Sequence, residues 1–145
     1  MGKQVYNNKG FSLLETIGVL FIISVIIIIL SYNPVKIFDK YKERLAVNEI
    51  VSDIYKVQTR SLVSDKSNYI HFFEESNKYI VYCDSIREDR YINADGLSGT
   101  GDRDLKFRYN RGNVNIANTI LVKFKNSTYE IIIHLETGYI TVNEK

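Results

Sequence analysis

The stretch KGFSLLETIGVLFII, residues 9–23, decides the fold, because it opens a long apolar run that carries an acid, Glu15, near its start. The run continues from Phe11 to Leu30, and as a helix it would be about 30 Å long, which matches the core of a bilayer. A carboxylate in hydrocarbon costs about 2.5–3.5 kcal/mol even on insertion scales. Glu15 therefore needs a partner charge, or it must reach the membrane interface.

A secretory signal peptide is the main alternative for this run. Its apolar section is usually about 7–15 residues long, and small residues follow at the cleavage site. The segment after the run, Ser31-Tyr32-Asn33-Pro34, offers no such site, so the sequence favours a membrane helix. Basic residues stand on both sides of the run, and the positive-inside rule therefore does not fix its orientation.

The remainder of the 145-residue chain is long enough for one small domain. Hydrophobic residues make up 45% of the chain, with 11 Tyr and 7 Phe, which favours a packed core over disorder. Lys3 and Lys9 account for the whole formal charge of +2, so the overall charge is no argument for nucleic-acid binding. Cys83 is the only cysteine, which excludes an internal disulfide and a cysteine-based metal site.

The N-terminal residues are similar to a known signal. A basic leader ending in Lys9-Gly10, followed by Phe11-Ser12-Leu13-Leu14-Glu15, resembles the class III signal of type IV pilins and pseudopilins. The resemblance implies that a prepilin peptidase cuts between Gly10 and Phe11 and methylates the new amine of Phe11. It also implies that Glu15 acts in assembly, because it can pair with that amine in a neighbouring subunit and set the register between helices.

Two features depart from the family pattern. The kinking proline of main pilins usually stands slightly earlier in the mature helix than Pro34, so a bend near Asn33-Pro34 does not follow from the resemblance. Ser12 stands where threonine is common.

The rest of the chain predicts an α+β, pilin-like fold, in which one long helix packs on an antiparallel sheet. We expect a leader at 1–10, a transmembrane and filament-core helix at 11–32, its amphipathic continuation at 33–64, and a β-sheet head at 65–145. On the second helix, Glu49, Asp53 and Lys56 would face solvent. Alternating or apolar runs predict strands at 68–74, 78–83, 105–109, 119–125, 128–135 and 138–142. Their short links favour antiparallel pairing.

A closer resemblance covers most of residues 11–142. The segments VSDIYKVQTRSLVSDKS (51–67), GNVNIANTILVKF (112–124) and YEIIIHLETGYITV (129–142) are similar to minor pseudopilins of the type II secretion H type and especially of the competence ComGD type. The resemblance implies a minor subunit of a competence pilus that brings DNA through the wall. The precursor would cross the cytoplasmic membrane once, and the mature form would lie in a surface filament. Implied partners are the prepilin peptidase, other pilin or pseudopilin subunits, and the assembly ATPase with its platform protein.

DNA is a further candidate partner, because the segment 103–125 is locally basic and contains Phe107 and Tyr109. On one face of the sheet, four cations would form a weak DNA-contacting patch: Lys106, Arg108, Lys123 and Lys125. The alternative is that these charges are simply the solvent side of half-buried strands.

Other polar segments suggest no catalytic or metal site. The loop DGLSGTGDRD (95–104) lacks the spacing of an EF-hand and the end of a phosphate loop, so we expect a variable surface loop. His71 and His134 lie in strand patterns about sixty residues apart and have no ligand spacing. The sequence therefore predicts no enzyme, no cofactor and no metal.

Two other functions stay open. The chain could be a minor subunit of a type IV pilus or a secretion pseudopilus with no DNA role. It could also be a binding domain with a single membrane anchor that forms no filament.

Overall fold

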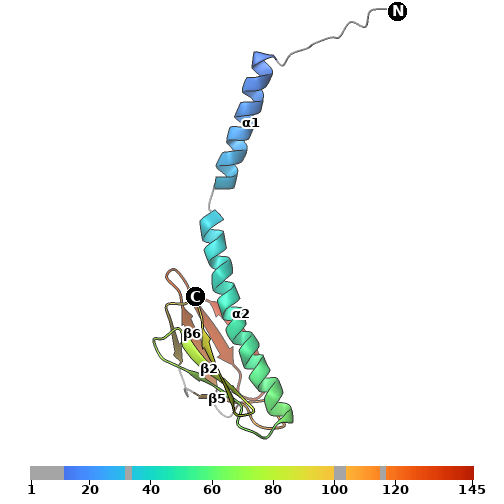
Figure 1. Cartoon of the computed structure of the whole chain (residues 1–145), viewed down its shortest axis with the longest axis vertical. Helices are drawn as coiled ribbons and strands as arrows, with labels where there is room; N and C mark the ends of the chain where they lie inside the picture. The colour runs from blue at the N-terminus through green and yellow to red at the C-terminus, as the bar shows by residue number, and fades with distance from the viewer. Residues whose placement is uncertain (1–11, 32–33, 100–103, 115–116) are drawn as a thin grey trace, which may run out of the picture. The chain divides into compact units, whose positions relative to one another are not determined.

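The computed structural model describes residues 12–31, 34–99, 104–114 and 117–145. Within these residues, helix α1 (Leu13–Ser31) and helix α2 (Pro34–Val63) precede eight strands (Figure 1). The chain divides into two compact units, residues 1–39 and 40–145. The expected leader, the cleavage site at Gly10 and Phe11, and a bend at Asn33 lie outside the described residues.

Helix α1 is apolar around its whole circumference, and none of its side chains is buried. The helix that begins at Leu13 is long and apolar enough to cross a membrane. Its β-branched run at 25–29 would disfavour a helix in water, whereas in lipid a helix satisfies every backbone group internally. The hydroxyl of Ser24 is also satisfied within the helix, because its Oγ donates to the carbonyl of Leu20 over 2.8 Å.

The strands form two four-stranded antiparallel sheets. The first sheet has the order β3-β2-β1-β5, with β1 (Tyr69–Phe72), β2 (Lys78–Cys83), β3 (Ile86–Tyr91) and β5 (Asp104–Lys106). The second has the order β4-β6-β7-β8, with β4 (Gly96–Gly99), β6 (Asn118–Lys123), β7 (Thr128–Ile133) and β8 (Ile140–Glu144). The sheets meet where the N–H of Leu97 donates to the carbonyl of Ser76 over 2.8 Å.

One core holds α2 and both sheets together. The inner stripe of α2, with Val47, Ile50, Ile54 and Val57, packs with inward-facing residues of both sheets such as Ile131. Figure 1 shows α2 lying along the strands. The predicted α+β, pilin-like class is confirmed.

Strands β3 and β4 were not expected. Strand β3 reads IREDRY and has no alternation of apolar and polar residues. Its charged side chains form ion pairs and do not enter the core. Strand β4 reads GLSG, and the expected surface loop at 95–104 is therefore wrong for Gly96–Gly99, where Leu97 is fully buried. Residues 100–103 of that loop lie outside the described residues.

The expected single sheet is also wrong. Strands β5 and β6 are consecutive in the second half of the chain, yet they belong to different sheets. Among the described residues, an isolated bridge between Phe107 and Val114 joins the segments that follow β5 and precede β6. The chain therefore passes from the first sheet to the second between β5 and β6. A short link between two strand-like runs does not require that the two runs pair with each other.

Candidate functional site

The first turn of α1 is capped by a side chain. The Oγ of Ser12 accepts a hydrogen bond from the N–H of Glu15 over 3.2 Å, and the carbonyl of Ser12 accepts from the N–H of Thr16. Ser12 is therefore the N-cap and Glu15 the third helical residue, which is the S-x-x-E pattern of a capping box. Sequence reasoning missed this pattern, although residues 12–15 display it directly.

Glu15 is exposed at the positive end of the α1 dipole, where a carboxylate is favourable. Among the described residues it has no ion pair within its own chain. An unpaired carboxylate at the start of a membrane-length apolar helix is available to a charge from another chain. The implied partner group, the amine of Phe11, lies outside the described residues.

Helix α2 has a second face, which points away from the core. Along this face, exposed residues alternate at steps of four and three: Tyr41, Leu45, Asn48, Ser52, Tyr55, Thr59 and Leu62. Residues at these steps share one side of a helix, and three of the seven, Asn48, Ser52 and Thr59, are polar. The buried stripe is offset from it by two residues, which places the two stripes on opposite sides of the helix. We call the exposed one the outer stripe of α2.

Asp53 does not face solvent as expected. Its carboxylate is buried and accepts a 2.8 Å hydrogen bond from the hydroxyl of Tyr79, and it lies 3.3 Å from Nε of Arg90. Burial and the neighbouring carboxylate raise the pKa of Tyr79 well above its usual range, so the phenol stays protonated and donates. Glu49 and Lys56 are exposed as expected.

The four cations of the expected DNA patch do not share a sheet. Lys106 lies on β5 of the first sheet, with Nζ 3.2 Å from Asp104 and 5.2 Å from the centre of the Tyr69 ring. Lys123 ends β6 in the second sheet, and Lys125 follows it in the turn. Arg108 is exposed beyond β5. The expectation of one shared sheet face is wrong, and DNA contact by these side chains stays a prediction.

The two histidines are strand-associated, as their patterns predict. Nδ1 of His71, on β1, lies 2.5 Å from Oδ1 of Asp104, and Nε2 of His134 lies 2.9 Å from Oγ1 of Thr141. Partial burial acts to raise the pKa of Asp104, but hydrogen bonds from His71 and Lys106 outweigh it and hold that pKa below its usual range. In the part of the chain that the structure describes, no three His, Cys, Asp or Glu residues gather into a metal site.

The family model described as the prokaryotic N-terminal methylation motif matches residues 6–31, which include Ser12, Glu15 and all of α1. The chain carries the N-terminal methylation motif that type IV pilins and pseudopilins have. This confirms the resemblance that the residues around Gly10 and Glu15 suggested. A pilin-like subunit is a structural protein and not an enzyme, and its motif implies processing by a prepilin peptidase and assembly with pilus partners.

Over its full length, the chain is similar to a curated protein. It is 28% identical over 149 residues to the competence protein ComGD of Bacillus subtilis (strain 168), and the match covers 100% of both chains. No solved structure gives a significant match. The pilin-like helix is consistent with a membrane precursor and a surface pilus.

Proposed function

We propose that this pilin-like chain is a minor subunit of a competence pilus that takes up DNA. The observation that carries the proposal is the full-length similarity to a competence protein, which spans the head as well as the methylation motif. In this account the precursor crosses the cytoplasmic membrane once, with a leader at 1–10 and a membrane helix at 11–32. Prepilin peptidase cuts it between Gly10 and Phe11 and methylates Phe11.

Assembly would proceed through α1 and the outer stripe of α2. The assembly ATPase and its platform protein would extract the subunit, and α1 would enter the filament core beside the helices of other subunits. Because α1 is apolar on all sides, it is stable only in lipid or in a bundle of similar helices. Glu15 would pair with the Phe11 amine of a neighbour and thereby fix the axial register.

The proposal is tested first in a strain that lacks the gene. Three properties are scored in parallel: transformation by added DNA, surface pili and secreted protein. Lost transformation with pili and secretion intact is the expected result. Lost pili or lost secretion with normal transformation would instead favour a minor subunit of a type IV pilus or a secretion pseudopilus.

The role of Glu15 is tested by two variants that separate charge pairing from helix capping. Glu15→Gln removes the charge and keeps a side chain that suits the capping position, whereas Ser12→Ala removes the cap hydroxyl and keeps the charge. Charge pairing predicts that Glu15→Gln stays in the membrane fraction and that Ser12→Ala still enters sheared filaments. The opposite pattern would assign Glu15 to capping, and a normal phenotype for both would favour a plain membrane anchor.

DNA contact is a separate step of the proposal. Exposed cations that bind phosphates would make DNA binding fall steeply with salt. The double variant Arg108→Ala plus Lys123→Ala tests the patch, with transformation and DNA retention measured in cells that still assemble pili. If both are unchanged, Lys106, Arg108, Lys123 and Lys125 are ordinary solvated strand residues.

A further inference from the structure

The exposed apolar side chains of α2 are concentrated in its first three turns, residues 34–45. Among the described residues of this segment, five large hydrophobic side chains are strongly exposed: Val35, Ile37, Phe38, Tyr41 and Leu45. Residues 46–63, a longer part of the same helix, expose three. Ile37, Tyr41 and Leu45 follow one another at steps of four, so they share one side of the helix. We call residues 34–45 the proximal segment of α2.

The proximal segment comes directly after the membrane-length helix. Helix α1 ends at Ser31, and α2 begins at Pro34. An extended chain advances at most about 3.6 Å per residue, so these two helix ends lie no more than about 11 Å apart. The polar headgroup layer beside the hydrocarbon core of a bilayer is about 5–7 Å thick. If α1 spans the core, α2 therefore begins within reach of the lipid headgroups.

Basic residues accompany the apolar side chains of the proximal segment. They are Lys36, Lys40, Lys42 and Arg44, and the acids of the segment are Asp39 and Glu43. Three of the basic residues follow at steps of four, one position before each member of the apolar row, so they form a second row beside it. Such a pattern is typical of a helix at a membrane surface, where cations lie near lipid phosphates and tyrosine is common.

Part of this positive charge is neutralised within the head. Glu144 on β8 lies 2.8 Å from Nζ of Lys40 and 3.7 Å from Arg44. Lys36 is exposed and has no ion pair among the described residues. Because only a small positive excess remains, the apolar row would supply most of the affinity for a membrane, and the cations a smaller part.

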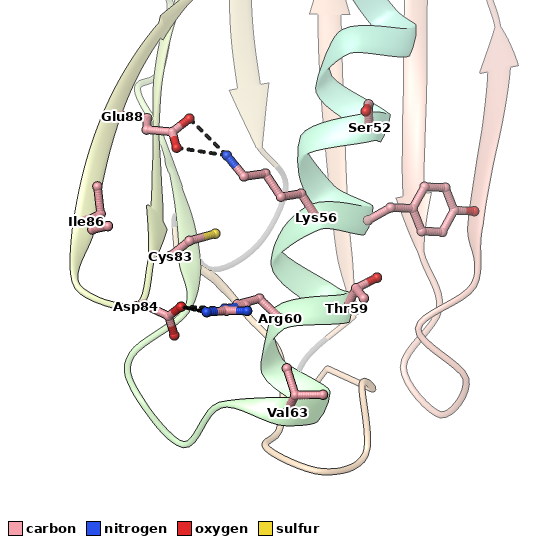
Figure 2. A pocket seen from close by; sticks show the side chains of 10 residues that line it. Ser52, Lys56, Thr59, Arg60, Val63, Cys83, Asp84, Ile86 and Glu88 are labelled. Atoms are coloured by element: carbon pink, nitrogen blue, oxygen red, sulfur yellow. Dashed lines mark hydrogen bonds and ion pairs between the residues drawn. The ribbon is translucent and has the colours of Figure 1, made fainter.

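Farther along α2, the cations are held by acids of the head. Figure 2 shows Lys56 paired with Glu88 on β3, and Arg60 paired with Asp84 in the turn between β2 and β3. The Lys56–Glu88 pair is 2.8 Å long. A membrane surface would have to compete with these ion pairs, so the later turns of α2 are less suited to lipid than the proximal segment.

The end of α2 is also tied to two connections of the head. Nε2 of Gln58 donates to the carbonyl of Gly112 over 2.7 Å and to the carbonyl of Gly138 over 3.2 Å. Gln58 therefore holds the loop at 108–113 and the turn between β7 and β8 against α2. These contacts fix the later turns of the helix in the head, far along the chain from the membrane-length helix.

We propose that, before assembly, the proximal segment of α2 lies at the bilayer surface, with Ile37, Tyr41 and Leu45 in the boundary between headgroups and acyl chains. This inference deepens the proposed function and rests on it, because it requires α1 as the membrane helix. The lipid contact would hold the start of α2 at the membrane until the subunit is extracted. The apolar row would then exchange lipid for the helices of other subunits.

The test uses the fact that the chain contains no tryptophan, so that a single Trp reports its own surroundings. Three full-length variants, Leu20→Trp, Tyr41→Trp and Tyr55→Trp, are reconstituted in vesicles of phosphatidylglycerol and phosphatidylcholine with brominated acyl chains, which quench Trp fluorescence on contact. Tyr55 is the matched control, because it is an exposed tyrosine of the same outer stripe, about 21 Å farther along the helix. We expect strong quenching at positions 20 and 41, and quenching about threefold weaker or less at position 55.

A second substitution tests the apolar row directly. In the Tyr41→Trp chain, Leu45→Glu should lower the quenching about twofold or more, because it places a carboxylate in the apolar row. Leu62→Glu is its matched control, since Leu62 is an exposed leucine of the same stripe near the other end of α2, and it should leave the signal unchanged.

Equal quenching at positions 41 and 55 would overturn the proposal. So would a signal at position 41 that Leu45→Glu leaves unchanged. The Leu20→Trp chain reports insertion of α1 separately. Quenching at position 20 with none at position 41 would overturn the lipid contact of α2 alone and leave the proposed function intact. Absence of quenching at position 20 would overturn the membrane helix itself, and with it this inference.

Discussion

The hydroxyl of Tyr79 on β2 donates a 2.8 Å hydrogen bond to Oδ2 of Asp53 on α2, and both residues are buried. This bond joins the helix to the first sheet inside the apolar core. A buried carboxylate is costly unless it is hydrogen-bonded and paired, and Arg90 supplies the opposite charge at 3.3 Å. The position of α2 on the sheet therefore depends on a polar contact as well as on apolar packing.

Tyr79→Phe is expected to destabilise the head by about 1–3 kcal/mol, because it leaves the Asp53 carboxylate buried without its donor. The free energy of unfolding can be measured by denaturant titration of the detergent-solubilised chain, followed by circular dichroism. Tyr109→Phe is the control, since Tyr109 is exposed in a turn and its loss should change stability by less than about 0.5 kcal/mol. Equal stability of both variants would show that Arg90 alone satisfies Asp53.

Asp84 is expected to make the stability of the head depend on pH in the acid range. Hydrogen bonds from Arg60 and Ser64 hold the pKa of Asp84 below its ordinary value of 3.8. Because the pKa is depressed in the folded state, the contribution is fully present well above pH 3.8. It is lost as the pH falls through the folded pKa.

The measurement compares wild type with Asp84→Asn over that range. The variant should be less stable near neutral pH, and the difference should shrink as the pH falls below 3.8. Asp65→Asn is the control, because Asp65 is exposed and has no ion pair among the described residues. A difference that stays constant with pH would mean that the carboxylate of Asp84 does not hold the turn.

The sequence predicted the elements whose apolar pattern faces the core, and it failed where polar contacts determine the structure. The run TYEIIIHL gave β7, and KYIVYC gave β2 with the observed bounds. Strand β3 was missed because its charged residues pair with β2 and with α2, which no periodicity reveals. The burial of Asp53 depends on Tyr79, which lies 26 residues away in sequence.

The candidate site shows the same contrast between features that depend on neighbouring residues and features that depend on distant ones. The methylation motif and the membrane-length helix are local features, so the residues at 9–30 were sufficient to predict them. The contact of α2 with the 108–113 loop and the β7–β8 turn could not be predicted, because these segments come together only in the folded chain. Likewise, the four cations could not be assigned to two sheets without knowing that β5 and β6 do not pair.

Gly138→Ala is expected to destabilise the head by about 1–3 kcal/mol and to loosen the contact of the β7–β8 turn with the end of α2. Gly138 has φ of 65°, and an added Cβ would lie 2.5 Å from both Nε2 of Gln58 and the carbonyl oxygen of Gly112. The turn would have to move, so both hydrogen bonds of Gln58 would be strained or lost. Hydrogen exchange of the amides in 108–113 and 134–139, together with denaturant unfolding, would measure the change.

Gly99→Ala is the matched control for this substitution. A Cβ at Gly99, on β4, meets nothing within 4 Å, and alanine in a strand costs less conformational entropy than glycine. Gly99→Ala should therefore be neutral or slightly stabilising, with unchanged exchange of the amides in 108–113 and 134–139. If Gly138→Ala behaved in the same way, the Gln58 contacts would not hold the two connections together.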